Sequence, residues 1–203
     1  SVGLRDYNRE LGKKGISALL QEVAEKHPEQ YRQIAKELSD VGRDVAYSTG
    51  GNSFGLKHMR KSLVAQKAYA KLRVAIERVH ANPKLTDKQK DEKVLVLVEA
   101  ANTPLIDAIY RETAQAGNPL ARQVSSGSRG NPINLRGLLA GDGTYVDGQD
   151  RPLPIPVLSS YSEGLNPVEY WASTYGSRKG ITDVKLATAD AGYMAKQMNR
   201  ATH

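Results

Sequence analysis

Apolar residues recur every three or four positions along most of the chain, which is the spacing of helices that bury one face. The first such pattern covers residues 8–42. Pro28 divides it, because a proline disfavours helical geometry at the residue before it, so the second helix is expected at 29–40. Residues 41–55 then collect glycines and small hydroxyl side chains, and this composition predicts a loop.

Two longer patterns follow at 56–81 and 86–115, and together they predict a helical hairpin with a charge-rich, projecting tip. The second arm opens with a capping-box signature, in which Thr86 and Gln89 each bond the other's backbone N–H. Pro104 removes a helical donor inside this arm, so a kink or a break is expected there.

The last third of the chain changes from glycine-rich to helical. Residues 117–130 are rich in Gly and Ser and predict a loop, and residues 141–156 predict a short β-hairpin. Prolines at every second position from 152 to 156 confine its second strand to an edge. A final helix is expected from Asn166, a good N-cap with proline after it and Glu169 closing a capping box, to residue 203.

The predicted fold class is therefore mainly α with a small β-hairpin. The expected shape is elongated, with a projecting helical hairpin and a long C-terminal helix. Four segments are predicted: N-terminal helices and a Gly/Ser loop (1–55), the hairpin (56–117), a Gly/Ser loop with the β-hairpin (118–165), and the long helix (166–203).

Charge and composition narrow the function. The 203 residues include 29 Lys and Arg against 22 Asp and Glu, a formal net charge of +7, which favours a polyanionic partner such as nucleic acid. The absence of cysteine excludes disulfides, thiol nucleophiles and Cys-type zinc sites. Apolar runs are too short to span a bilayer, so no membrane association is expected. A cytoplasmic protein, or one packaged in a virion, fits these properties.

The final helix contains the most specific motif. Residues 173–193 read STYGSRKGITDVKLATADAGY. This string resembles the bridge helix of the largest (β′-type) subunit of multisubunit DNA-directed RNA polymerases, where a close S-T-H-G-A-R-K-G-x-x-D-T-A-L-x-T-A-D-S-G-Y occurs.

Shorter segments extend the resemblance over nearly the whole chain. SGSRG at 126–130 resembles the family's S-G-A-R-G, and YSEGL at 161–165 resembles its F-R-E-G-L. The loop at 47–55 and the hairpin at 56–115 resemble the secondary-channel rim, with less specific motifs. The stretch 140–145 departs from the family's G-M-R-G-L-M, so contacts made by that segment are not carried over.

The resemblance implies that the helix crosses the active-site cleft and bends during translocation. Thr188 and Ala189 would then face the template base and the nascent pair, since short side chains leave room for a base. Tyr193, one turn beyond Ala189, would brace the helix or stack on a base. Without the motif, a Thr-Ala pair in a helix is ordinary filler and a lone tyrosine ordinary packing.

Three basic residues and three glycines complete the implied site. Arg178 and Lys179 match the family's Arg-Lys and would contact phosphate or a neighbouring loop; a solvated face is the alternative. Arg129 would hold its loop against the helix, or be an exposed loop cation. The glycines cost about 1 kcal/mol each in a helix, so they are expected to be hinges or to permit close packing: Gly176, Gly180 and Gly192.

No catalytic or metal-binding residue is predicted in this sequence. The family's N-A-D-F-D-G-D motif, which holds the catalytic Mg²⁺, does not occur here, so Mg²⁺ is expected on a partner chain and no cofactor on this one. The trigger loop is likewise not matched. Asp142, Asp147 and Asp150 lie in turn sequence beside glycines, where aspartate is ordinary turn chemistry. The four histidines lack ligand spacing, and His203 matches no catalytic histidine.

Two main functions remain, and a weaker third. The first is a part of a multisubunit RNA polymerase that supplies bridge helix and channel rim, works with other polymerase subunits, the DNA template and the RNA product, and is not catalytic alone. The second is a non-enzymatic virion structural or regulatory protein that reuses this fold beside other virion proteins. The third is a free-standing basic RNA-binding module.

Overall fold

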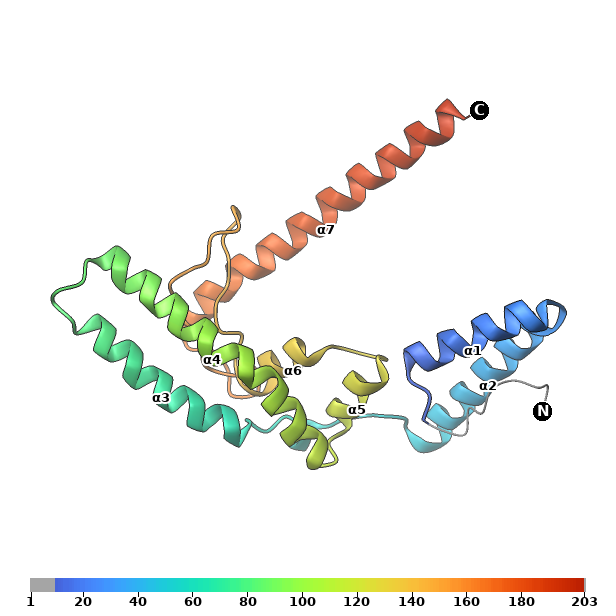
Figure 1. The fold of residues 1–203 in the computed structure, drawn as a ribbon, viewed down its shortest axis with the longest axis horizontal. Coiled ribbons are helices and arrows are strands. Elements are labelled where there is room, and N and C mark those ends of the chain that lie inside the picture. Colours follow the sequence, from blue (N-terminus) through green and yellow to red (C-terminus); the bar gives the residue numbers. More distant parts are fainter. Residues whose placement is uncertain (1–9, 203) are drawn as a thin grey trace.

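A computed structural model describes residues 10–202, which fold into seven α-helices, with a long connection between the last two (Figure 1). This confirms the mainly α prediction. The helices are α1 (Lys13–Lys26), α2 (Tyr31–Thr49), α3 (Leu63–His80), α4 (Asp87–Gln115), α5 (Pro119–Ser126), α6 (Pro132–Leu139) and α7 (Pro167–Ala201). Two 3₁₀ turns, η1 (Pro28–Gln30) and η2 (Leu56–His58), precede α2 and α3.

The core lies between α3 and α4, the two arms of the expected hairpin (Figure 1). Each arm contributes buried side chains at three- and four-residue spacing, and each large one adds about 1.5–3 kcal/mol. They are Ala65, Tyr69, Leu72 and Ile76 on α3, and Val94, Val98, Leu105 and Ile109 on α4. The Thr86 capping box is confirmed. Of the kink or break expected at Pro104, the break does not occur: α4 continues through it, since Leu105 and Ile109 beyond it are buried in this core.

Helices α5 and α6 cover one part of α4, and both lie where the sequence analysis was wrong. Residues 117–130 were expected to be a loop, but most of them form α5, and α6 was not predicted. Each helix begins with an Asn-Pro pair whose Asn caps it: Asn118 accepts from the Leu120 N–H at 3.0 Å, and Asn131 from the Asn134 N–H at 2.8 Å. Burial of one leucine-bearing face of each helix then outweighs the glycines between them.

The N-terminal helices form a second hairpin, α1 against α2. The break at Pro28 is confirmed as η1, but α2 runs to Thr49 instead of stopping near residue 40. The expected loop at 41–55 is therefore limited to 50–55. Helix α2 ends at Gly50, whose φ of 72° reverses the chain in the left-handed region that glycine tolerates.

The predicted β-hairpin is not a sheet. Within residues 10–202 no strand forms, and the segment 141–157 carries two isolated antiparallel bridges, Gly143 with Val157 and Val146 with Pro152. The chain does reverse as expected, with paired N–H donations between Gly143 and Val157 at 2.9 and 2.6 Å. The two bridges differ in register by two residues, so the pairing does not continue from one to the other as a ladder.

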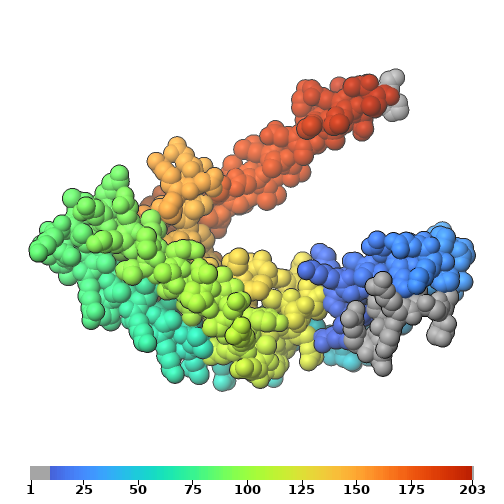
Figure 2. All heavy atoms as spheres, viewed as in Figure 1, coloured from blue at the N-terminus to red at the C-terminus, as the bar shows by residue number. Residues whose placement is uncertain are grey.

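Helix α7 leaves the body as a free arm of 35 residues, about 52 Å long (Figure 1). It begins at Pro167 and continues unbroken to Ala201, as the sequence predicts. Every residue from Gly180 to Thr202 is exposed, and Figure 2 shows this part standing clear of the rest of the molecule. The elongated shape is thereby confirmed.

Candidate nucleic-acid interface on the C-terminal helix

The first turn of α7 is closed by the predicted capping box. The Asn166 side chain accepts from the N–H groups of Val168 and Glu169 at 3.0 and 2.9 Å, and the Glu169 carboxylate accepts from the Asn166 N–H at 3.2 Å. Pro167 occupies the first helical position, where its missing N–H costs nothing. Local sequence therefore fixes where this helix begins.

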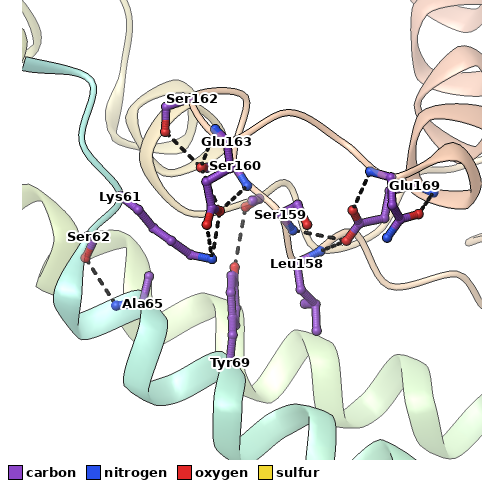
Figure 3. Close-up of polar contacts among 12 residues, drawn as sticks. Lys61, Ser62, Ala65, Tyr69, Leu158, Ser159, Ser160, Ser162, Glu163 and Glu169 are labelled. Carbon is purple, nitrogen blue, oxygen red and sulfur yellow. Dashed lines mark hydrogen bonds and ion pairs between the residues drawn. The ribbon is translucent and has the colours of Figure 1, made fainter. Parts of the chain in front are cut away.

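Glu169 also attaches α7 to the body. Its side chain is buried, with the residue only 5% exposed, and its Oε1 accepts from the backbone N–H groups of Leu158 and Ser159 at 2.9 and 3.1 Å (Figure 3). Leu158 belongs to the hydrophobic core of α3 and α4. A single carboxylate thus links the start of α7 to the core through the backbone that precedes it.

A turn in the YSEGL segment connects this region to α3 (Figure 3). Glu163 pairs with Lys61 at 2.7 Å and accepts from the Ser160 N–H at 3.3 Å. Partial burial acts to raise the pKa of Glu163, but the hydrogen bonds from Lys61 and Ser160 outweigh it and leave this pKa below its ordinary value. The carboxylate therefore stays charged and holds the turn beside α3.

Gly176 receives the ring of Tyr145, from the reversing segment 141–157. A Cβ at Gly176 would lie 2.7 Å from Cε1 of that ring and closer still to Cδ1, so only glycine admits the ring. The Tyr145 hydroxyl bonds the Asp142 carboxylate and lies 2.6 Å from the Tyr161 hydroxyl, which donates to Asp142 at 2.7 Å. Burial, and then the bonds to Asp142 and Tyr161, raise the pKa of Tyr145. The phenol remains protonated and in place.

Lys179 is held by two carboxylates. Its Nζ lies 2.9 Å from Asp183, one turn along α7, and 3.0 Å from Asp150 at the tip of the reversing segment. The hydrogen bonds to Asp183 and Asp150, in that order, raise the pKa of Lys179. Its side chain is 20% exposed, whereas neighbouring Arg178 is exposed and makes no ion pair within residues 10–202. The two cations of the Arg-Lys pair thus have different surroundings.

From Arg178 onward the helix presents two distinct faces, since residues three and four apart share a face. The first face, here the cationic stripe, combines basic and very small residues at exposed positions: Arg178, Lys185, Ala189, Gly192 and Lys196. The second face, the apolar stripe, lies beside it: Val184, Thr188, Ala191, Ala195 and Met198.

These stripes separate the residues that the sequence analysis placed together. Ala189 lies on the cationic stripe, one turn after Lys185, and Tyr193 borders it one turn further on, 64% exposed. Thr188 lies on the apolar stripe, about 100° around the helix from Ala189. All three side chains are exposed in the part of the chain that the structure describes. Their roles toward template and nascent pair stay predictions.

Arg129 lies on a different part of the molecule. It follows α5, its backbone N–H donates to the Gln123 carbonyl at 3.3 Å, and its side chain is exposed. It borders a small apolar cavity of about 200 Å³ between α5, α6 and Phe54. Among the residues described, it forms no hydrogen bond or ion pair with α7, so its expected contact with that helix stays a prediction.

The three glycines of α7 differ in what surrounds them. A Cβ at Gly180 or Gly192 would meet nothing within 4 Å, whereas one at Gly176 would collide with Tyr145. Gly176 therefore has the close-packing role that the sequence analysis left open beside a hinge. Gly180 is the first residue of the fully exposed part of the helix.

The described residues include no metal-binding group. Within residues 10–202, no three His, Asp or Glu side chains come together so as to hold a metal ion. Asp147 is committed to its turn: hydrogen bonds from the backbone and side chain of Arg151 lower its pKa. His203 lies outside the described residues. No helix in the described part combines the length and apolar character needed to cross a membrane.

Sequence reasoning missed the residues that mount α7. Tyr145 lies in a stretch where the resemblance fails, and Asp150 was interpreted only as turn chemistry. The positive φ of Asp150, 61°, is a turn feature, but nothing in the sequence shows that this turn reaches α7. Glu169 was recognised as a cap. Its second role, the attachment of α7 to the body, could not be predicted because it depends on where the fold places Leu158.

The sequence of this chain is similar to segments of known proteins. No protein-family model matches the chain. The β′ subunit of DNA-directed RNA polymerase from Thermobifida fusca is 32% identical over 198 residues, 94% of this chain. The β′-β″ subunit of Cyanidioschyzon merolae is 31% identical over 95% of the chain, and the β′ subunit of Fusobacterium nucleatum 28% over 98%.

The chain is a distant homologue of a segment of the RNA polymerase β′ subunit. It spans only 12–15% of the length of these three relatives. The matched part of this chain includes almost all of the described helices, because it covers 94% or more of the sequence. The β′ resemblance of the sequence is thereby confirmed at the level of this segment.

Proposed function

We propose that this β′-like chain is part of a multisubunit DNA-directed RNA polymerase, in which α7 is the bridge helix and the α3–α4 hairpin forms the rim of the secondary channel. One observation carries the proposal: the segment that resembles the bridge helix is fixed to the body at one end and fully exposed beyond Gly180. A helix in this state has its surface available to a template and to companion subunits.

The cationic stripe supplies the chemistry for nucleic acid. Lys185 and Lys196 flank Ala189 by one and two turns, and within residues 10–202 neither makes an ion pair. Cations at this spacing suit phosphates, whereas the methyl side chain of Ala189 between them leaves room for a base to approach. Tyr193 beside Ala189 offers a ring for stacking, worth about 1–3 kcal/mol per base.

Lys179 takes a different part in this function. Because it is paired with Asp150 and Asp183, it stabilises the base of the helix, and Arg178 is the member of the pair that is free to contact phosphate. Bending during translocation is assigned to Gly180 and Gly192, which have open surroundings. The apolar stripe, which includes Thr188, then faces protein from another part of the enzyme.

The catalytic metal belongs to a companion chain in this proposal. Two-metal phosphoryl chemistry needs clustered carboxylates, and the grouping of acidic side chains in residues 10–202 does not provide them. The role of this chain is to position the template and the nascent pair relative to a metal ion that a companion chain binds. Its partners are therefore other polymerase subunits, the DNA template and the RNA product.

A site-specific cross-link tests the proposal. A photoreactive benzoylphenylalanine replaces Ala189 in the complex purified with its companion subunits, and the same residue replaces Ala187 in a matched control. The two alanines are both exposed and lie about 200° apart around the helix. We expect Ala189 to cross-link to the template strand during elongation and Ala187 to give at least five times less. Equal yields, or no nucleic-acid product from a transcribing complex, would overturn the proposal.

Purification of the native complex distinguishes a polymerase subunit from a non-enzymatic virion protein. Companion chains with an Asp-rich metal loop support the polymerase function. Capsid or tail proteins alone would instead indicate the non-enzymatic virion protein. No observation on residues 10–202 favours this alternative.

A further inference from the structure

The reversing segment 142–157 lies along one flank of α7 at its base, as the orange loop in Figure 1 shows. It touches the helix at two points one turn apart, Tyr145 against Gly176 and Asp150 against Lys179. Both contacts join residues that are about 30 positions apart in the sequence. They are independent in kind, since one is steric and the other is an ion pair.

The steric contact is rigid. The Tyr145 ring fills the space of a missing Cβ at Gly176, and its hydroxyl is bound by Asp142 and Tyr161. Asp142 is itself held, because Arg136 donates to its backbone carbonyl at 2.8 Å. The ring therefore cannot swing away without breaking this group of hydrogen bonds.

The ionic contact lies at the last point before the helix becomes free. Asp150 and Asp183 pair with Lys179 from the reversing segment and from α7 itself, so this lysine joins the two elements. The next residue, Gly180, begins the fully exposed part. Support along the flank of α7 thus ends where the arm begins.

We infer that residues 142–157 form a strut that sets the direction in which α7 leaves the body, with Tyr145 and Asp150 as its positioning residues. Neither residue belongs to a motif quoted for the polymerase resemblance: Tyr145 lies in 140–145, where the match fails, and Asp150 lies between that stretch and YSEGL at 161–165. The strut itself does not depend on the proposed function. Only its purpose does: in a polymerase, the direction of α7 would bring the cationic stripe to the nucleic acid.

The length of α7 makes the effect of the strut measurable, because a small tilt at the base moves the far end of the helix by several ångströms. From Gly176 to Ala201 the helix extends for about 38 Å, so a tilt of roughly 10° at the strut moves the far end by roughly 7 Å. The chain contains no cysteine, so two introduced cysteines accept spin labels without background. Glu99 on α4 and Lys196 on α7 are exposed positions for the labels.

The experiment measures the distance distribution between the two labels in the 203-residue chain. We expect Gly176→Ala to displace the ring and shift the mean by at least 4 Å, and Tyr145→Ala to broaden the distribution. Gly42→Ala is the matched control, because this glycine also lies inside a helix, α2, and its Cβ meets nothing within 4 Å; it should leave the mean within about 1 Å. Unchanged distributions for both Gly176→Ala and Tyr145→Ala would overturn the strut.

A double variant distinguishes positioning from general damage. If Gly176→Ala acts through the ring, it should add no further shift in a Tyr145→Ala background, whereas additive shifts would contradict the inference. Tyr145→Phe keeps the ring and should retain a wild-type mean. Asp150→Ala should broaden the distribution, with Gln149→Ala as its neighbour control, and it tests the strut even where Gly176→Ala fails to fold.

The two hypotheses fail separately. Loss of the Ala189 cross-link with intact distance shifts would overturn the polymerase function and keep the strut. Intact cross-linking with no distance shift would do the reverse. Where both hold, Gly176→Ala in the assembled complex should lower the Ala189 cross-link several-fold, and Gly42→Ala on α2 should leave it unchanged.

Discussion

Replacing Glu169 by alanine should destabilise the protein more than any other single change of an acidic residue on α7. The carboxylate is buried and accepts three backbone hydrogen bonds, from Leu158, Ser159 and Asn166, at 2.9–3.2 Å. Hydrogen bonds to charged groups contribute about 1.5–3 kcal/mol each, and an orphaned buried donor costs about 1–3 kcal/mol. Only Leu158 is fully buried, since Ser159 and Asn166 have access to water. We therefore expect a loss of about 2–4 kcal/mol.

The assay is the free energy of unfolding from a urea titration followed by circular dichroism. Glu169→Gln keeps one acceptor oxygen for Leu158 and Ser159, so its loss should be about half as large. Glu92→Ala is the control: this glutamate is exposed on α4, and its removal should change stability by less than about 0.5 kcal/mol. Amide exchange should become faster at Leu158 and Ser159. A loss below about 0.5 kcal/mol for Glu169→Ala would refute the claim that this carboxylate anchors α7.

A buried hydrogen bond and a surface ion pair give two further predictions about stability. Tyr69→Phe removes a hydrogen bond of 2.8 Å to Asn102 inside the core, so the free energy of unfolding should fall by about 1–2 kcal/mol. Tyr170→Phe, at an exposed site, is the control and should change it little. The pKa of Glu163 is below its ordinary value of 4.5 in the folded chain, so its contribution is complete above that value and is lost as the pH falls through the folded pKa. Urea titrations between pH 3 and 6 should show this loss, and Lys61→Ala should reduce it; an equal slope in both proteins would contradict the pairing.

Helix ends were the part of the fold that local sequence determined best. The capping boxes at Thr86 and Asn166 were predicted from side chains within three residues of each other, and both form. Capping depends on a few adjacent residues, so the signal is complete in the sequence. The same Asn-Pro signature occurs at 118–119 and 131–132, but the sequence analysis did not use it, and α5 and α6 were missed. Their stability comes from packing on α4, which lies far away in sequence.

The predicted β-hairpin shows the opposite error. The turn at Asp147 and Gly148 was recognised, and the chain reverses there, but reversal alone does not make a sheet. A ladder needs one continuous register, and the two bridges here are offset by two residues along the return arm. The rest of the segment's stability comes from side chains, through Tyr145 and Asp142, that no strand propensity describes.

The candidate interface divides in the same way. The exposed stripes of α7 follow from helical periodicity, so once the helix is predicted, Lys185, Ala189 and Lys196 fall on one face without further information. Lys179 does not, because its partner Asp150 is brought to it by a turn whose path only the fold defines.

This difference bears on how net charge is interpreted at the interface. Sequence gives Arg178 and Lys179 equal weight as phosphate contacts, yet a lysine already bound to two carboxylates presents little field to a polyanion, while its unpaired neighbour presents its full charge. The glycines divide likewise: one permits contact with the strut, and two have open space around them. The motif therefore combines two physical tasks in one continuous string. Gly176 and Lys179 fix the helix, whereas Arg178 and the residues after Gly180 offer a surface. A substitution in the first group should therefore act on the direction of the helix, and one in the second on what the helix touches.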